Sequence, residues 1–238
     1  MFYGYGYYYD PTYILVIAAL LLGVIAQARM RSAFSKYSRV RSMRGLTGSE
    51  AARQILAANG ITDVQIERVG GDLTDHFDPR SKVLRLSEPV YASDSVAALG
   101  VAAHEAGHAV QHAKGYFPIK LRNALVPVAN IGSYLALPLV ILGLVLSSAY
   151  HMTGLSILID IGIWLFVGVV LFQVVTLPVE LNASRRAVTA LSEQNLILEE
   201  ERAGVKRVLT AAALTYVAAT LSALLQLLRL VLLTRRRR

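Results

Sequence analysis

Four long apolar runs alternate with polar segments along the chain. They cover residues 13–28, 124–149, 155–177 and 208–234. A helix needs about 20 apolar residues to cross a bilayer, so the second and third runs predict two spanning helices joined by the short loop 150–154. The fourth run is interrupted by Arg229 and allows three interpretations: a further span, a helix packed partly on a soluble domain, or a re-entrant segment. We therefore expect about three to four transmembrane helices.

The first run predicts an uncleaved membrane anchor. Residues 2–9 are mostly aromatic and are expected to lie at the membrane interface. Asp10 is the only charge before the run, whereas a cleaved signal peptide carries its positive charges there. The basic residues follow the run instead: Arg29, Arg31, Lys36, Arg39, Arg41 and Arg44. Because cytoplasmic flanks are rich in Lys and Arg, we expect the N-terminus outside and this basic flank inside the cell.

The segment between the first and second runs predicts two helices. Thr47 and Glu50 have the spacing of a capping box, in which each side chain satisfies a backbone amide at the helix start. This helix is expected to stop at residues 59–60, an Asn-Gly pair. Serines within residues 93–95 can cap a second helix, which is expected to stop at Gly115.

Three short strands are expected between these helices. Residues 64–69 alternate apolar and polar side chains, and a Gly-Gly pair follows. Residues 73–77 and 82–86 flank an Asp-Pro-Arg-Ser sequence, which is typical of a turn. The pattern predicts a small, mostly antiparallel sheet.

Composition supports a membrane protein with one small polar domain. Hydrophobic residues make up 55% of the 238 residues, and the mean hydropathy is +0.48, whereas soluble domains are about 45–50% apolar. The residues outside the runs suffice for one compact domain. The net charge is +8, but the basic residues crowd the ends of the apolar runs, so membrane orientation explains them and no nucleic-acid partner is expected. The absence of cysteine excludes disulfides and thiolate metal sites.

The second predicted helix contains the motif His104-Glu105-Ala106-Gly107-His108. Residues four apart lie on one face of a helix, so both histidines can bind one Zn²⁺. Glu105 projects beside them, where it can act on a water molecule as a general base without binding the metal. The small residues around the histidines leave room for another backbone or a substrate to approach closely.

A catalytic zinc usually has a third protein ligand, and Glu180 is the best candidate. Two membrane crossings separate it from the motif, and two crossings return the chain to the same side. An interfacial acid paired with Arg185 or Arg186 is an equally supported interpretation. His112 lies too far along a continuous helix, about 12 Å beyond His104. His76 remains a possible supporting residue, and His151 is expected across the membrane.

The order of these elements resembles the gluzincin membrane proteases of the HtpX and CAAX prenyl protease type. Closer still, the chain is similar to the YugP-like neutral zinc metallopeptidases of bacteria. The resemblance rests on residues 73–80, 100–109 and 179–186 and extends over most of the chain. It implies that Glu180 is the third zinc ligand and that the substrate is a peptide or protein, membrane proteins included. HtpX-type enzymes carry Asp at the position of Ser184, so Ser184 is expected to orient a zinc histidine without adding charge.

Together these observations predict a membrane protein that is mainly α with a small β-sheet and a zincin-like catalytic domain. The predicted parts are an anchor (1–30), a zincin-like domain (31–123), two transmembrane helices (124–177), a helical segment with the third ligand (178–207), and an apolar helix with a basic tail (208–238). The predicted function is that of a multi-pass zinc endopeptidase of the plasma membrane, with Glu105 as the catalytic base at the cytoplasmic face. A peptide substrate would pair with an exposed strand such as 82–86.

Two alternatives belong to other classes. One is a non-catalytic membrane protein that binds zinc structurally, or a scaffold. A closed structural site would need a fourth protein ligand, for which only His76 or His112 is available. The other is an intramembrane protease, which the polar residues flanking the motif helix argue against.

Overall fold

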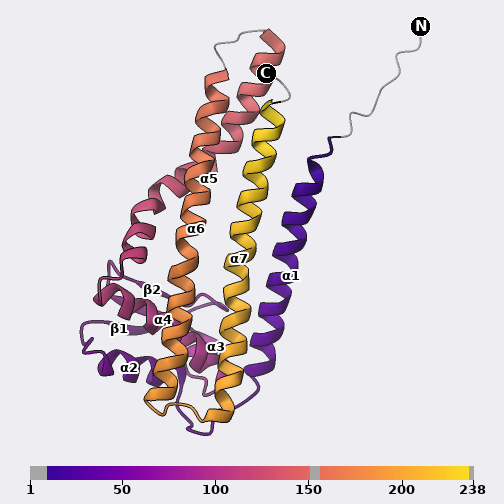
Figure 1. Ribbon diagram of the computed structural model, residues 1–238. Coiled ribbons are helices and arrows are strands. Elements are labelled where there is room, and N and C mark those ends of the chain that lie inside the picture. The colour runs from indigo at the N-terminus through magenta and orange to yellow at the C-terminus, as the bar shows by residue number, and fades with distance from the viewer. Residues whose placement is uncertain (1–9, 151–155, 236–238) are drawn as a thin grey trace.

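The computed structural model describes residues 10–150 and 156–235, and it confirms a mainly α-helical membrane protein with a small sheet. Four of the described helices are long and apolar enough to cross a membrane: α1 (Tyr13–Tyr37), α5 (Phe117–Tyr150), α6 (Ser156–Glu193) and α7 (Glu199–Arg235). They stand side by side, and the shorter elements gather at one end (Figure 1). The expected aromatic belt, residues 2–9, and His151 lie outside the described residues.

The fourth apolar run forms the greater part of α7, which is continuous and lies beside α1 (Figure 1). Arg229, which interrupts this run, lies near the far end of α7. Its guanidinium carbon is 4.9 Å from the centre of the Tyr13 ring, and Nη2 is 4.0 Å from Asp10 Oδ2. The first charge before α1 thus lies next to the charge that interrupts α7, which explains why an apolar helix carries an arginine there.

Helices α5 and α6 pack closely through glycine. A Cβ atom at Gly132 would lie 2.6 Å from the backbone oxygen of Leu165, and one at Gly162 would lie 2.7 Å from that of Ala136. Small residues let membrane helices approach closely where no hydrophobic effect drives them together. This tight pair leads the chain away from the polar end and back to it.

The polar end contains α2 (Gly48–Ala58), α3 (Glu88–Tyr91) and α4 (Val96–Ala113). The predicted capping box is present at α2, since the Thr47 side chain accepts from the Glu50 amide and the Glu50 carboxylate accepts from the Thr47 amide. Ser95 caps α4 by accepting from the amide of Ala98 at 3.2 Å. The buried core of this end surrounds α4 with residues from α2, the sheet, α6 and α7.

The sheet corrects two expectations. Its strands are β1 (Gln65–Val69), β2 (His76–Asp78) and β3 (Val83–Ser87), in the order β1-β3-β2. β3 is antiparallel to β2 but parallel to β1 over five residue pairs, so the mostly antiparallel prediction is wrong. The reason is that β3 is the most buried strand and takes the centre, between two more exposed strands. Consequently the segment 82–86 has neighbours on both sides and offers no free edge to a peptide.

Candidate metal centre

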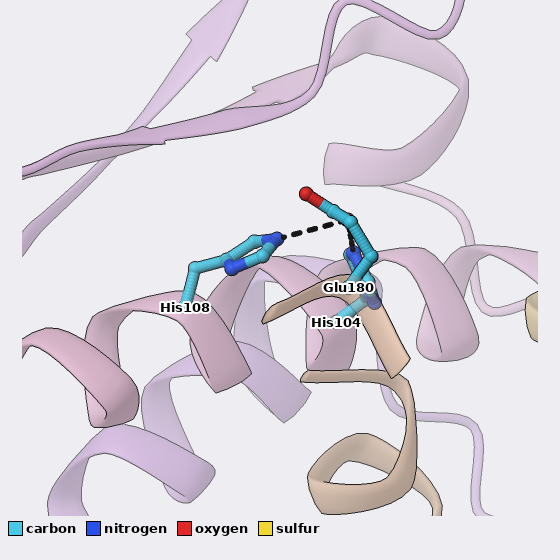
Figure 2. Close-up of side chains that lie close together, drawn as sticks. All are labelled: His104, His108 and Glu180. Atoms are coloured by element: carbon cyan, nitrogen blue, oxygen red, sulfur yellow. Dashed lines mark hydrogen bonds and ion pairs between the residues drawn. The ribbon is translucent and has the colours of Figure 1, made fainter. Parts of the chain in front are cut away.

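His104, His108 and Glu180 converge on one point at the junction of α4 and α6 (Figure 2). Nε2 of His104 lies 3.2 Å from Glu180 Oε2, and Nε2 of His108 lies 3.5 Å from the same oxygen. The side chain of His104 is 12% exposed, that of His108 10% and that of Glu180 3%. The rings of His104 and His108 stand edge to face with their centres 4.7 Å apart. This is expected for two residues one helical turn apart whose side chains point towards the same place.

Close backbone contact between α4 and α6 brings Glu180 to the motif. A Cβ atom at Gly107 would lie 3.0 Å from the backbone oxygen of Ala183, one turn beyond Glu180. A larger residue at 107 would push the helices apart. Pro178 lies inside α6, and the helix continues through it to Glu193, so the segment with Glu180 is an extension of a spanning helix.

Gln111 determines which nitrogen of His108 faces Glu180. The amide oxygen of Gln111 lies 3.0 Å from His108 Nδ1, and its amide nitrogen donates to the backbone oxygen of Val179 and to Asn182 Oδ1. Since a carbonyl oxygen can only accept, His108 Nδ1 must carry the proton. In the neutral ring, Nε2 on the Glu180 side therefore carries the lone pair that a metal ion would bind.

Ser184 has the corresponding position on His104. Its hydroxyl oxygen lies 3.1 Å from His104 Nδ1, so the other ring nitrogen, Nε2, faces Glu180. The serine hydroxyl can accept a hydrogen bond from Nδ1–H of His104, but, unlike a carboxylate, it places no negative charge beside the imidazole. Ser184 belongs to α6, and so do Val179 and Asn182, which accept hydrogen bonds from the Gln111 amide.

The distances from the two histidines to Glu180 are close to those between the ligand atoms of a tetrahedral zinc site. Zinc binds imidazole and carboxylate at about 2.0–2.2 Å, and tetrahedral angles then place the ligand atoms about 3.3–3.5 Å apart. The two Nε2–Oε2 distances of 3.2 and 3.5 Å match this spacing. Among the described residues the group has three members, which leaves a fourth position for water or substrate.

The electrostatics also favour a cation at this point. Burial lowers the pKa of His108, but its hydrogen bond with Glu180 and the charges of Glu105 and Glu180 outweigh this and raise the pKa above its ordinary value. The negative potential that favours a proton on His108 favours a divalent cation in the same way. Arg122, with Nη1 3.8 Å from Glu180 Oε1, partly balances it.

A cavity of about 250 Å³ opens onto His108 and Glu180, two of the three candidate metal ligands. Glu105, Arg122 and Tyr216 line it, and so do residues of the β2 segment. Its complete lining is Asp75, His76, Phe77, Pro79, Glu105, His108, Ile119, Arg122, Asn123, Val126, Glu180 and Tyr216. A molecule in this cavity would meet the side chains of Glu105, Arg122 and Tyr216 beside His108 and Glu180.

The remaining predicted residues lie near this cavity or away from it. His76 lines the cavity from β2, and its Nδ1 lies 2.8 Å from the backbone oxygen of Thr74. His112 is exposed and contacts the ring of Phe77 with 6.0 Å between ring centres, and it is not a member of the group formed by His104, His108 and Glu180. Glu180 pairs with the two histidines and Arg122, while Arg186 donates to Asn182.

Three residues of the site were not predicted from sequence. Gln111 follows His108 by three positions, so its place one turn along the same face could have been noticed. Arg122 and Tyr216 come from α5 and α7, and nothing in the spacing of these helices indicates that they meet the motif.

Comparison with known proteins supports a peptidase. Residues 12–235 match the model of a family described as "Putative neutral zinc metallopeptidase". The "Putative membrane protease YugP" of Bacillus subtilis (strain 168) is 49% identical over 219 residues, which cover 92% of this chain and 94% of that protein. No solved structure gives a significant match.

Replacing Gln111 tests the orientation of His108. We expect Gln111→Leu to lower zinc affinity by about 10- to 100-fold, because loss of an outer partner frees the ring and its tautomer. Competition with a chromogenic chelator measures the affinity. The matched control is Gln54→Leu, at an exposed position on α2. Equal affinities of the two variants would contradict this role.

Proposed function

Since the chain belongs to the neutral zinc metallopeptidase family, we propose that His104, His108 and Glu180 hold the zinc ion of a membrane endopeptidase. The observation that carries this proposal is the convergence of three donors at zinc spacing, with Glu105 beside them. When bound, zinc supplies a Lewis acid that polarises the scissile carbonyl and makes water acidic enough to lose a proton near neutral pH.

Glu105 is the proposed general base. It is 9% exposed, lines the cavity and lies outside the metal-binding group. Its carboxylate takes a proton from the attacking water and delivers it to the nitrogen of the leaving amine. A non-catalytic zinc site would be closed by a fourth protein ligand, and no fourth His, Asp or Glu among the described residues joins the group.

Tyr216 and Arg122 are proposed to stabilise the charge that develops on the carbonyl oxygen. Both line the cavity with Glu180, Tyr216 from α7 and Arg122 from α5. Donors held in a poorly hydrated site before the reaction begins lower its barrier more than the same donors in water.

The substrate is proposed to pair with β2, not with the segment 82–86 first expected. β2 is an edge strand, and its residues His76 and Phe77 line the cavity. An extended peptide can add to a free strand edge through backbone hydrogen bonds. A second cavity, on the His104 side, shares Asp75, Glu105 and Tyr216 with the first. Space on both sides of the metal suits a bond within a chain, hence an endopeptidase.

We place the site at the cytoplasmic face of a multi-pass protein. The basic flank follows α1 at the end where α4 and the sheet lie (Figure 1), and Arg185 and Arg186 follow Glu180 within two turns of α6. The connection 150–155 between α5 and α6 contains no Lys or Arg. The arginines after α7 favour the reverse orientation but are fewer than those at the domain end, so the positive-inside tendency supports a cytoplasmic domain end.

Glu105→Gln tests the mechanism. The variant should bind zinc as the wild type does and lose about 10²- to 10⁴-fold in kcat, the usual contribution of a general base. Zinc content is measured by mass spectrometry and cleavage with a library of quenched fluorescent peptides. Glu193→Gln, at the exposed end of α6, is the control. Undiminished cleavage by Glu105→Gln would remove this residue from the mechanism.

Tyr216→Phe tests the second part of the site. Removing only the hydroxyl should lower kcat by about 10²- to 10³-fold and leave KM and zinc content nearly unchanged, because the hydrogen bond forms in the transition state. Steady-state kinetics separate the two constants. Tyr134→Phe, 79% exposed on α5, serves as the control. A change in KM alone would assign Tyr216 to substrate binding instead.

The absence of cysteine allows a direct test of orientation. Pro11→Cys and Asp72→Cys place single thiols at exposed positions near opposite ends of the long helices. In intact cells a membrane-impermeant maleimide should label position 11 only, and lysis should expose position 72. Labelling of position 72 alone in intact cells would place the metal site outside the cytoplasm.

A further inference from the structure

A second cavity, of about 150 Å³, lies on the His104 side of the metal ligands. Its walls come from α1, α4, α7 and the segment before β2. The lining residues are Met30, Phe34, Leu73, Asp75, Val101, His104, Glu105, Val208, Leu209, Ala212 and Tyr216. It touches the first cavity at Asp75, Glu105 and Tyr216. A group inside it therefore lies next to the proposed base and the metal.

The walls of this cavity are apolar apart from the catalytic edge. Asp75 is the one lining acid outside the motif, and its carboxylate accepts from the amide and hydroxyl of Ser87 at 2.7 and 2.8 Å. Burial raises the pKa of this carboxyl above its ordinary value, although the hydrogen bonds from Ser87 oppose the shift. An acid held in this way offers little to a charged ligand, so the space suits an apolar group.

Leu73 closes one side of the cavity from a costly backbone conformation. Its φ is 56°, in the left-handed region that leucine rarely adopts. A polar residue, Asn or Asp, or a glycine would be the usual choice at such a position. An apolar side chain placed there at the expense of backbone strain extends the apolar wall to the β2 side.

The size of the cavity limits what can enter. An apolar space of about 150 Å³ has room for a benzene-sized molecule. A phenyl ring or a branched aliphatic side chain therefore has the size of this space. Ala212 on α7 and Phe34 on α1 line this space and set its volume. A larger residue at position 212 would fill the cavity. A smaller residue at position 34 would enlarge it.

Resting on the proposed peptidase function, we propose that this cavity binds the side chain of a substrate residue adjacent to the scissile bond and selects aromatic or branched aliphatic residues there. Because Met30 follows the apolar run of α1 and Val208 begins that of α7, the cavity lies where both helices leave their apolar runs. The preferred substrate is a polypeptide that presents this apolar residue at the membrane surface.

The test compares full-length, zinc-loaded variants in detergent with peptides that differ only in one residue beside the cleaved bond. Wild type should cleave the Phe peptide about 10- to 100-fold more efficiently than the Ala peptide, judged by kcat/KM. Ala212→Phe fills the cavity and should reduce this ratio to about 1. Phe34→Ala should shift the preference towards larger rings. Leu214→Phe, an exposed position on another face of α7, should behave as wild type. A wild-type ratio near 1, or one that Ala212→Phe leaves intact, overturns the proposal.

A binding measurement separates this proposal from the peptidase function. In the zinc-loaded Glu105→Gln background, calorimetry compares benzohydroxamate with acetohydroxamate, two zinc chelators that differ in their apolar group. The phenyl compound should bind about 10- to 100-fold more tightly, and Ala212→Phe should remove this advantage. Suppose that no peptide is cleaved, but benzohydroxamate binds more tightly than acetohydroxamate and Ala212→Phe removes this difference. The cavity assignment then stands and the peptidase function fails. If peptides are cleaved without either preference, the peptidase stands and the cavity assignment fails.

Discussion

A carboxylate buried on a membrane helix imposes the main constraint on this structure. Glu180 is almost completely shielded from solvent, and an isolated charge in such a place would be very unfavourable. Two imidazoles and a guanidinium surround it, and a cation between Glu180 and the two imidazoles would be bound by all three of these groups. The close contact at Gly107, the glycine packing of α5 on α6 and the hydrogen bonds of Gln111 all maintain that arrangement.

Helix α6 holds both the third donor and the groups that orient the other two. Ser184 contacts His104, while Val179 and Asn182 hold the amide of Gln111, which in turn holds His108. The orientation of each ring on α4 thus depends on where α6 lies. The packing of α4 on α6 therefore sets the geometry of the proposed metal site. Small residues, Gly107 and Ala183, occupy the contact because a change in the helix separation would move the donors.

Local chemistry predicted local structure well. The capping box at Thr47, the Ser95 cap and the shared face of His104 and His108 depend only on residues within one or two turns, and each is present. Sheet topology was mispredicted because alternation marks a strand without giving its direction or its neighbour. Glu180 stayed undecided between two pairings because its spacing from the motif fixes the side of the membrane and not the contact. Tyr216 and Arg122 were missed for the same reason: long-range packing brings them to the site.

The division of the ligands between α4 and α6 also orders events during synthesis. The ribosome makes the chain from its N-terminus, so His104 and His108 exist while α6 and α7 are still to come. A nascent chain that ends before α6 contains His104 and His108 but lacks Glu180 and Tyr216. The complete set can form only after α5 and α6 have been inserted and have folded back against α4. The site therefore stays incomplete until most of the polypeptide has been made.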